Sequence, residues 1–395
     1  MRIGFVVPRY GAGVVGGVER QVRDYATRLA ARGHAVEVLT TCATSHFTWR
    51  NELRPGTSVD EGVTVRRFRV TAAKDHGLMA NLHARLDAGF DLDPAGQRAW
   101  VENTGYSDEL LEGVAQAHTR TDALVFAPYL FASTVVGVHV RPERSLVVPC
   151  LHDEVYARFE PVREAMLACA GLVFNSPAEM RLGERLLGAR IPPHRVAGDG
   201  FEPPASRPDA AAWRARRGVD GALVAYAGRR EQAKNFPLLA AWTAIHSRAL
   251  ARERPVRLAA MGSGPVEAPP AARDWVVDLG VVGEAEKLDC MAASLAVAQL
   301  STRESFSYVV AEAWLSGTAA VVHAACEPTR EHCERSGGGV WVESPEEYSA
   351  ALSMLAADPA LRLRMAAQGR EYILDEYGWP RVLDRLERAV SEMVR

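Results

Sequence analysis

Short apolar runs alternate with amphipathic runs along almost the whole chain, and this alternation restricts the fold more than any other feature. Near the N-terminus, IGFVV predicts a strand, residues 19–32 predict a helix with one apolar face, and AVEVL predicts the next strand. Gly33 stands where that helix should end. Because strands that alternate with helices form parallel sheets covered by helices, we expect an α/β protein.

The alternation is interrupted around residues 198–218 and then starts again. The segment GDGFEPPASRPD is dense in glycine and proline, which is typical of a linker. A chain of 395 residues is also long for one compact domain. We therefore predict two Rossmann-like, doubly wound domains that face each other across a cleft. Further strands are expected at LVFAPY, SLVVPCL, GLVFNS, LVAYAG, VRLAAMG, LAVAQLS and AAVVHA, and further helices at 237–251, 284–294 and 307–316.

The composition excludes several classes of protein. With 48% hydrophobic residues, 24% charged residues and a net charge of -3, the chain has the balance of a soluble globular protein without a nucleic-acid partner. No export signal is visible, and the longest uncharged run, residues 123–140, contains proline and polar residues, so no transmembrane segment is expected. The six cysteines form no C-x-x-C pair, and we expect buried, reduced thiols in a cytoplasmic protein.

Glycines follow the first predicted strand. Gly11, Gly13 and Gly16 match the GxGxxG pattern of dinucleotide sites. Such a site also needs an acidic residue at the end of the second strand, but that strand ends in LTT, with Glu37 inside it. A dinucleotide is therefore disfavoured. Gly16 and Gly17, just before the helix, would instead let backbone N–H groups approach an anion, the alternative being a flexible loop without a ligand.

Two cations occupy a loop of the second half. The run AGRREQAKNFPLL places Arg229 and Lys234 directly after a predicted strand. Loops at the carboxyl ends of parallel strands are where such sheets bind ligands. A planar guanidinium and a compact ammonium can together neutralise a leaving diphosphate, although solvated loop charges would produce the same pattern.

The run RESFSYVVAEAW contains two glutamates with seven residues between them. Glu304 precedes a predicted helix, and Glu312 lies more than one turn inside it. The paired carboxyls of a glycosidase lie about 5–9.5 Å apart, whereas this spacing spreads the two side chains along a ligand. We therefore interpret them as contacts with separate hydroxyl groups. The backbone N–H groups of Ser307, Tyr308 and Val309 would point at an anion from the start of the helix.

These segments together resemble a known family. GGVERQVRDYATRLAARGHAVEVLT, GRREQAKNFPLL and the two glutamates, in this order, resemble the retaining glycosyltransferases of family 4, group 1 glycosyl transferases with the GT-B fold. The resemblance runs over nearly the whole chain. It implies an N-terminal acceptor-side domain over 1–200, a donor-binding domain for the nucleotide sugar over 201–378, and a C-terminal helix over 379–395 that packs back on the first domain.

The resemblance also implies roles for the charged residues of the second domain. Glu312 would hold the ribose hydroxyls of the nucleotide, and Glu304 would form hydrogen bonds with hydroxyls of the donor sugar. Arg229 and Lys234 would bind the diphosphate. The donor loop that carries these contacts would consist of Glu304, Ser305, Phe306, Ser307, Tyr308 and Val309.

In the first domain, the resemblance places Gly16 and Gly17 against the donor phosphate or the acceptor. It places His152, in the run VPCLHDE, at the position of a histidine near the transferred sugar. Taken alone, a histidine after a strand would be read as a satisfied core residue. The neighbouring Asp153 and Glu154, together with this position, favour the functional interpretation.

The chain departs from the family at several positions. Ser307 stands where the family often has glycine, and DGFE at 199–202 stands where it often has Asn-Gly-Val-Asp. Neither departure removes a charged ligand. Arg66, Arg67 and Arg69 in TVRRFRV could meet an anionic lipid in a peripheral membrane contact, although a solvated strand edge is the favoured interpretation.

The implied reaction moves a sugar from a nucleotide donor to an acceptor hydroxyl with retention of configuration. No residue is an obvious covalent nucleophile, so a front-face route that relies on charge stabilisation is expected. No D-x-D pattern is present, and neither a metal nor a cofactor is expected. The alternatives are an epimerase or hydrolase acting on sugar nucleotides, and a non-catalytic binding protein. A non-catalytic binding protein should lack some of the charged residues of the second domain. All four are present, namely Arg229, Lys234, Glu304 and Glu312.

Overall fold

The chain folds into two compact α/β units. The computed structural model describes residues 1–14, 16–71, 73–249 and 255–394. Unit 1 comprises Met1–Gly200 and Pro380–Arg395, and unit 2 comprises Phe201–Trp379. Each unit contains a sheet whose strands alternate with helices along the chain, as the sequence predicted. In the part of the chain that is described, no helix has the length and apolarity needed to cross a bilayer.

The sheet of unit 1 has the strand order β3-β4-β2-β1-β5-β6-β7-β8. Strands β3 and β4 form an antiparallel hairpin at one edge, and the other neighbouring strands pair in parallel. From β1 the chain adds β2 on one side and later β5 on the other, so the sheet changes direction between β1 and β5. The strands are β1 (Arg2–Val6), β2 (Ala35–Thr41), β3 (Gly56–Asp60), β4 (Val63–Phe68), β5 (Ala123–Phe126), β6 (Ser145–Val147), β7 (Gly171–Phe174) and β8 (His194–Val196).

Helices cover the sheet of unit 1, and the C-terminal helix α15 (Trp379–Met393) joins them. Its buried residues recur at helical spacing, with Val382, Leu386 and Val390 on one face. Polar contacts tie α15 to the end of α1, where the Arg32 guanidinium lies 2.6 Å from Asp384 Oδ1. The other helices are α1 (Gly17–Ala31), α2 (His76–Asp87), α3 (Pro94–Glu102), α4 (Asp108–Ala117), α5 (Ala132–Val135), α6 (Glu160–Ala168) and α7 (Pro177–Leu187).

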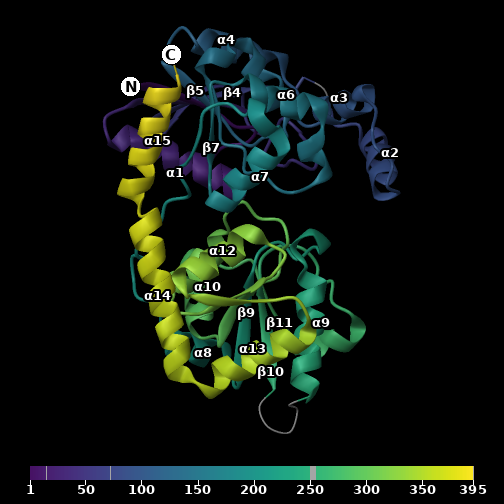
Figure 1. Ribbon diagram of the computed structural model, residues 1–395, viewed down its shortest axis with the longest axis vertical. Helices are drawn as coiled ribbons and strands as arrows, with labels where there is room; N and C mark the ends of the chain where they lie inside the picture. The colour runs from purple at the N-terminus through teal and green to yellow at the C-terminus, as the bar shows by residue number, and fades with distance from the viewer. Residues whose placement is uncertain (15, 72, 250–254, 395) are drawn as a thin grey trace. The chain divides into compact units, whose positions relative to one another are not determined.

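The sheet of unit 2 is parallel and has the order β11-β10-β9-β12-β13-β14. Helices α8 and α10 pack on one face and α9 and α13 on the other (Figure 1). Alternate residues of β9 therefore enter different cores, Leu223 and Ala225 on the first face and Val224 and Tyr226 on the second. The strands are β9 (Ala222–Ala227), β10 (Val256–Met261), β11 (Val276–Gly280), β12 (Ala296–Gln299), β13 (Ala320–His323) and β14 (Gly339–Val342). The helices are α8 (Ala210–Arg217), α9 (Phe236–Ala249), α10 (Glu284–Ala292), α11 (Tyr308–Leu315), α12 (Glu327–Ser336), α13 (Pro345–Ala357) and α14 (Pro359–Tyr377).

The structure corrects the predicted linker at its C-terminal end. Helix α8 occupies residues that the sequence placed in the interruption at 198–218. The Asp209 carboxylate accepts a hydrogen bond from the Ala212 N–H and so caps the helix, and the Trp213 side chain is buried in the core of unit 2. The helix predicted over 237–251 is described as α9 up to Ala249, and positions 250 and 251 lie outside the described residues.

A second correction concerns the arginines of TVRRFRV. Strand β4 is not the sheet edge, because β3 pairs with its outer side. Arg66 Nε donates to Glu37 Oε2 at 2.8 Å, and Arg67 donates to Ser58 Oγ at 2.8 Å. These guanidinium groups therefore stabilise pairing within the sheet, and the solvated-edge interpretation was wrong for them. The hairpin was missed because its outer strand is exposed and carries no apolar run.

Candidate active site

Most of the predicted site residues lie at one point of the sheet of unit 2. Strands β9 and β12 are neighbours although β10 and β11 lie between them in sequence, so the strand order reverses here. The loops that leave the carboxyl ends of β9 and β12 carry the candidate cations and Glu304. A reversal of this kind is where doubly wound sheets bind ligands, because the adjoining loops separate there.

Lys234 and Glu304 join these two loops. Lys234 Nζ lies 2.8 Å from Glu304 Oε1, and Gln299 Nε2 donates to the same oxygen at 3.4 Å. Asn235 Nδ2 donates to the Leu300 carbonyl at 2.8 Å and adds a neutral link. Asn235 has a φ of 53°, and asparagine tolerates this left-handed conformation better than most residues. The two loops are therefore held together by one ion pair and by amide hydrogen bonds.

The adjacent arginines of the β9 loop have different environments. The Arg230 side chain is 3% exposed, lies 2.8 Å from Asp278 Oδ1 and donates to the Gly262 carbonyl at 2.6 Å. The Arg229 side chain is 47% exposed and lies 3.1 Å from Glu231. Arg230 thus fixes the loop against its neighbours, and Arg229 is the arginine that a ligand can reach.

Glu312 has a partner that the sequence did not indicate. Its carboxylate is buried, and its Oε1 lies 2.8 Å from Lys287 Nζ. Lys287 lies in α10 and also contacts Glu284 at 2.9 Å. Glu304 and Glu312 therefore belong to separate ion pairs. Lys287 was missed because a lysine three residues after a glutamate is typical of a solvated helix face.

The donor loop between the two glutamates is fixed by an aromatic cluster. The Phe306 ring is buried and lies 5.6 Å from Phe201, 4.4 Å from His332 and 4.8 Å from Tyr377, measured between centroids. Burial lowers the pKa of His332 to about 3, so this imidazole is neutral at physiological pH. The Phe306 ring therefore packs in the core. Only the backbone of this residue is available to contact a donor.

Helix α11 begins directly after Phe306. Ser307 is its N-cap residue, and Tyr308 and Val309 open the first turn. The first N–H groups of a helix have no partner within it and favour anions. Ser305 precedes the cap in the same loop. Helix α11 thus begins between the two glutamates, where the sequence predicted its start.

In unit 1, Gly16 and Gly17 stand at the start of α1. Gly16 is extended, with a φ of 168°, so its conformation does not require glycine. A Cβ at Gly16 would instead collide with the Glu19 carboxylate, which forms a buried ion pair with Arg9. A Cβ at Gly17 would meet open space. Packing against Glu19 therefore explains why position 16 is glycine. The sequence pattern could not distinguish this cause from anion binding.

His152 lies in the loop after β6, in unit 1. Its Nδ1 is 3.9 Å from Glu154 Oε1, and the Tyr129 hydroxyl donates to the same oxygen at 2.5 Å. The His152 side chain is 30% exposed, so the core interpretation that the sequence left open does not apply. The loop also reaches α1, because the Cys150 thiol donates to Gln21 Oε1 at 3.5 Å.

A buried carboxyl group holds the base of the His152 loop. Glu179, in the first turn of α7, accepts hydrogen bonds from the backbone N–H groups of Leu151 and Asn175, each at 2.5 Å. Burial raises the pKa of Glu179 to about 8, against the lowering effect of these two hydrogen bonds. Sequence reasoning missed Glu179, because it lies in an ordinary helix-start pattern, SPAE.

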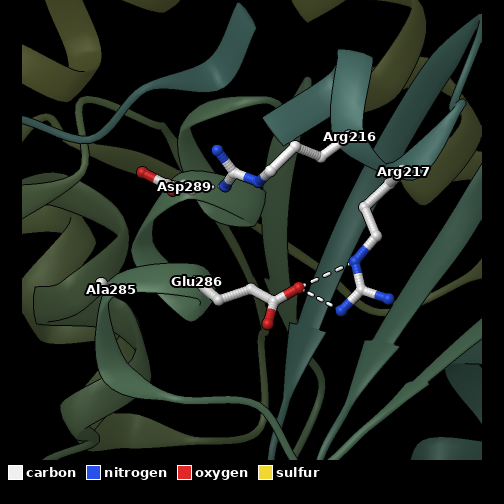
Figure 2. Close-up of a pocket in the computed structure, with 5 residues that line it drawn as sticks. All are labelled: Arg216, Arg217, Ala285, Glu286 and Asp289. Atoms are coloured by element: carbon white, nitrogen blue, oxygen red, sulfur yellow. Dashed lines mark hydrogen bonds and ion pairs between the residues drawn. The ribbon is translucent and has the colours of Figure 1, made fainter. Parts of the chain in front are cut away.

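The six cysteines are buried free thiols, as predicted. Over the described ranges, no group of three or more His, Cys, Asp or Glu side chains could hold a metal ion. A cavity of about 460 Å³ lies between α8 and α10 and is lined by Arg216, Arg217, Ala285, Glu286 and Asp289 (Figure 2). Its two arginines are already paired with carboxylates, Arg216 with Asp289 and Arg217 with Glu286. This cavity therefore offers an incoming anion little net positive charge.

Comparison with known proteins agrees with this architecture. Residues 221–358 match the family model of Glycosyl transferases group 1. A D-inositol 3-phosphate glycosyltransferase from Saccharomonospora viridis is 26% identical, over 94% of this chain and 88% of its own. Sucrose-phosphate synthase from Thermosynechococcus elongatus has 17% identity and a TM-score of 0.70, over 100% of this chain and 99% of its own. HepE from Anabaena, in complex with UDP, has 18% identity and a TM-score of 0.68, over 99% of this chain and 100% of its own.

The fold is therefore that of the GT-B glycosyltransferases, and the protein is a glycosyltransferase. The resemblance to the group 1 enzymes, expected from the order of the segments, is confirmed.

Proposed function

We propose that this protein is a retaining, family 4-type hexosyltransferase that moves a sugar from a nucleoside diphosphate donor to an acceptor hydroxyl. The observation that carries the proposal is the position of Arg229, Lys234 and Glu304 where the strand order of the unit 2 sheet reverses. A cationic and a hydroxyl-binding group stand there side by side, which matches the junction between a diphosphate and a sugar.

The proposed chemistry depends on charge stabilisation. As the bond between sugar and phosphate breaks, negative charge grows on the departing diphosphate. Arg229, Lys234 and the N–H groups at the start of α11 stabilise that charge, and the diphosphate accepts the proton of the acceptor hydroxyl on the same face of the sugar. Because the chain supplies these cations itself, we propose that the reaction needs no metal.

The two glutamates bind opposite ends of the donor in this proposal. Glu304 accepts hydrogen bonds from the sugar hydroxyls, and Glu312 accepts them from the nucleotide ribose. The ion pairs support these roles, since Lys234 and Lys287 hold the two carboxylates in separate positions along the binding site. His152 retains the role that the resemblance implies, a contact with the transferred sugar.

The relatives support a nucleotide-sugar donor. HepE of Anabaena has been solved with UDP and with UDP-glucose. A UDP-hexose is therefore the first donor to test. The compared proteins have different names, a D-inositol 3-phosphate glycosyltransferase and a sucrose-phosphate synthase, so a pool of acceptors is the appropriate test.

A donor screen tests the proposal. UDP-, GDP-, ADP- and dTDP-hexoses would each be incubated with a pool of hydroxyl acceptors, and products followed by mass spectrometry. We expect one nucleotide series to yield a hexosylated product whose anomeric configuration, read by NMR, matches the donor. Lys234→Ala should lower product formation by about 10²–10³-fold. Lys74→Ala, at a lysine of unit 1 that donates to the His46 carbonyl, should leave product formation unchanged. Sugar release or epimerisation without an acceptor would instead identify a hydrolase or an epimerase.

A further inference from the structure

The backbone of Ser307 has an unusual conformation. Its φ is 93° and its ψ is 97°, in the half of conformational space that glycine enters freely and residues with a Cβ avoid. Glycine at this position would therefore be less strained. Strained residues of this kind concentrate at ligand sites, where the surrounding structure holds them in place.

The hydroxyl of Ser307 does not serve the usual purpose of a serine at a helix start. A serine at the N-cap ordinarily accepts a hydrogen bond from an N–H group of the first turn, but the Ser307 side chain does not cap α11. Ser307 is only 7% exposed, and among the described residues its Oγ has no hydrogen-bond partner. Buried polar atoms are nearly always paired, so this hydroxyl lacks an explanation within the chain.

The position of Ser307 supplies the explanation. It stands between Glu304, which contacts Lys234, and Glu312, which contacts Lys287. It also stands at the N-terminus of α11, where backbone N–H groups favour an anion. A hydroxyl donor beside such N–H donors suits a phosphate oxygen, which accepts several hydrogen bonds at once.

We propose that the Ser307 hydroxyl donates a hydrogen bond to the distal phosphate of the nucleoside diphosphate, and that the strained backbone of Ser307 holds the hydroxyl in place. The inference rests on the proposed function and adds a side-chain contact to it. Glycine at position 307 would be less strained but could not supply the hydroxyl.

Two substitutions separate the hydroxyl from the backbone. Ser307→Ala removes the hydroxyl and keeps a Cβ, whereas Ser307→Gly removes the hydroxyl and relieves the strain. Ser316→Ala is the matched control, because Ser316 is a buried serine at the other end of α11 whose hydroxyl donates to the Ala313 carbonyl. Calorimetry would measure the affinity of each full-length variant for UDP and for UMP, which lacks the distal phosphate. Thermal unfolding would be followed in parallel.

We expect Ser307→Ala and Ser307→Gly to weaken UDP binding by about tenfold or more, the usual effect of losing a hydrogen bond to a charged group. UMP binding should stay within about twofold of the wild type, and Ser307→Gly should melt at a higher temperature than Ser307→Ala. If UDP affinity were unchanged in both variants, or if UMP affinity fell as much as UDP affinity, this inference would be wrong. The proposed function would still stand. A wild-type protein that binds none of UDP, GDP, ADP and dTDP would overturn the proposed function and, with it, this inference.

Discussion

Glu179 of unit 1 and Glu304 of unit 2 both follow the carboxyl end of a strand that pairs in parallel with its neighbours, yet their surroundings differ. Glu179 is 1% exposed and binds two backbone N–H groups of neighbouring loops. The Glu304 side chain is 12% exposed and pairs with Lys234, which is 24% exposed. A ligand can exchange into the second arrangement, because sugar hydroxyls and phosphate can replace or extend the contacts of the ion pair. The first arrangement is closed to ligands.

The comparison shows that a glutamate can either stabilise a loop or serve as a candidate ligand-binding group. Burial raises the pKa of Glu179, and its hydrogen bonds fix the loop that carries His152. The ion pair at Glu304 instead joins two loops, and the first of them also carries the partly exposed Arg229. Pairing with a cation at a partly exposed position therefore distinguishes Glu304, a candidate ligand-binding group, from Glu179, a structural carboxyl group.

The largest effect is expected for Lys234→Ala. Removing a cation that stabilises the departing diphosphate should lower the single-turnover transfer rate by about 10²–10³-fold and should weaken nucleoside diphosphate binding. Rapid-quench kinetics would give the rate, and calorimetry the affinity. The melting temperature should stay within a few degrees of the parent, because the side chain is partly exposed.

The partner of this ion pair provides the control. Glu304→Gln should lower turnover but leave nucleoside diphosphate affinity nearly unchanged, since Glu304 is proposed to contact only the sugar. If Glu304→Gln lost nucleotide affinity as severely as Lys234→Ala, the assignment of Glu304 to the sugar would be wrong.

The next effect compares the adjacent arginines. Arg230→Ala should destabilise the protein by about 2–3 kcal/mol, because it removes an ion pair with Asp278 and a charge-assisted hydrogen bond to the part-buried Gly262 carbonyl. Arg229→Ala should change stability by less than about 1 kcal/mol and should instead weaken diphosphate binding. Denaturant unfolding and calorimetry on both variants would measure the two effects. The reverse assignment of stability and binding would refute the division of roles between these arginines.

A smaller, pH-dependent effect is expected at Glu179. Its pKa is about 8 in the folded protein against 4.5 in the unfolded chain, so the folded state binds the proton more tightly between these values. The stability that Glu179 contributes is therefore fully present below pH 4.5 and is lost as the pH rises through 8. The slope is at most about 1.4 kcal/mol per pH unit.

Glu179→Gln removes this titration. The difference in unfolding free energy between wild type and Glu179→Gln, measured by denaturant titration from pH 5 to 9, should shift in favour of the variant as the pH rises. Taking the difference cancels the other titrating groups, such as His118 and His332, which both proteins share. A difference that does not change with pH would mean that Glu179 is already ionised in the folded protein at low pH.

The smallest effect is expected for metal removal. Transfer should persist in excess EDTA at close to the untreated rate, because Arg229 and Lys234 are proposed to neutralise the diphosphate. A loss of activity that magnesium or manganese restores would show that Arg229 and Lys234 do not suffice to neutralise the diphosphate.

Much of the site-bearing fold could be predicted from local pattern. Strands β9 and β12 and helix α11 lie within two residues of the predicted elements, because burial on both faces of a parallel sheet leaves continuous apolar runs in the sequence. The onset of α11 also placed its first N–H groups between the two glutamates. Elements without a periodic pattern of apolar residues were not predicted. They include the exposed strand β3 and the helix α8 inside the Gly- and Pro-rich segment.

By itself the sequence determined which residues follow each buried strand, since apolar periodicity is a local property that one segment displays without its neighbours. The tertiary structure decided what those residues do. It paired Glu312 with Lys287 of another helix, buried Arg230 while leaving Arg229 exposed, and turned Phe306 into the core. It also left the Ser307 hydroxyl buried without a partner in the described chain. The physical reason is that ion pairing, burial and hydrogen-bond satisfaction depend on segments far apart in sequence, which only folding brings together.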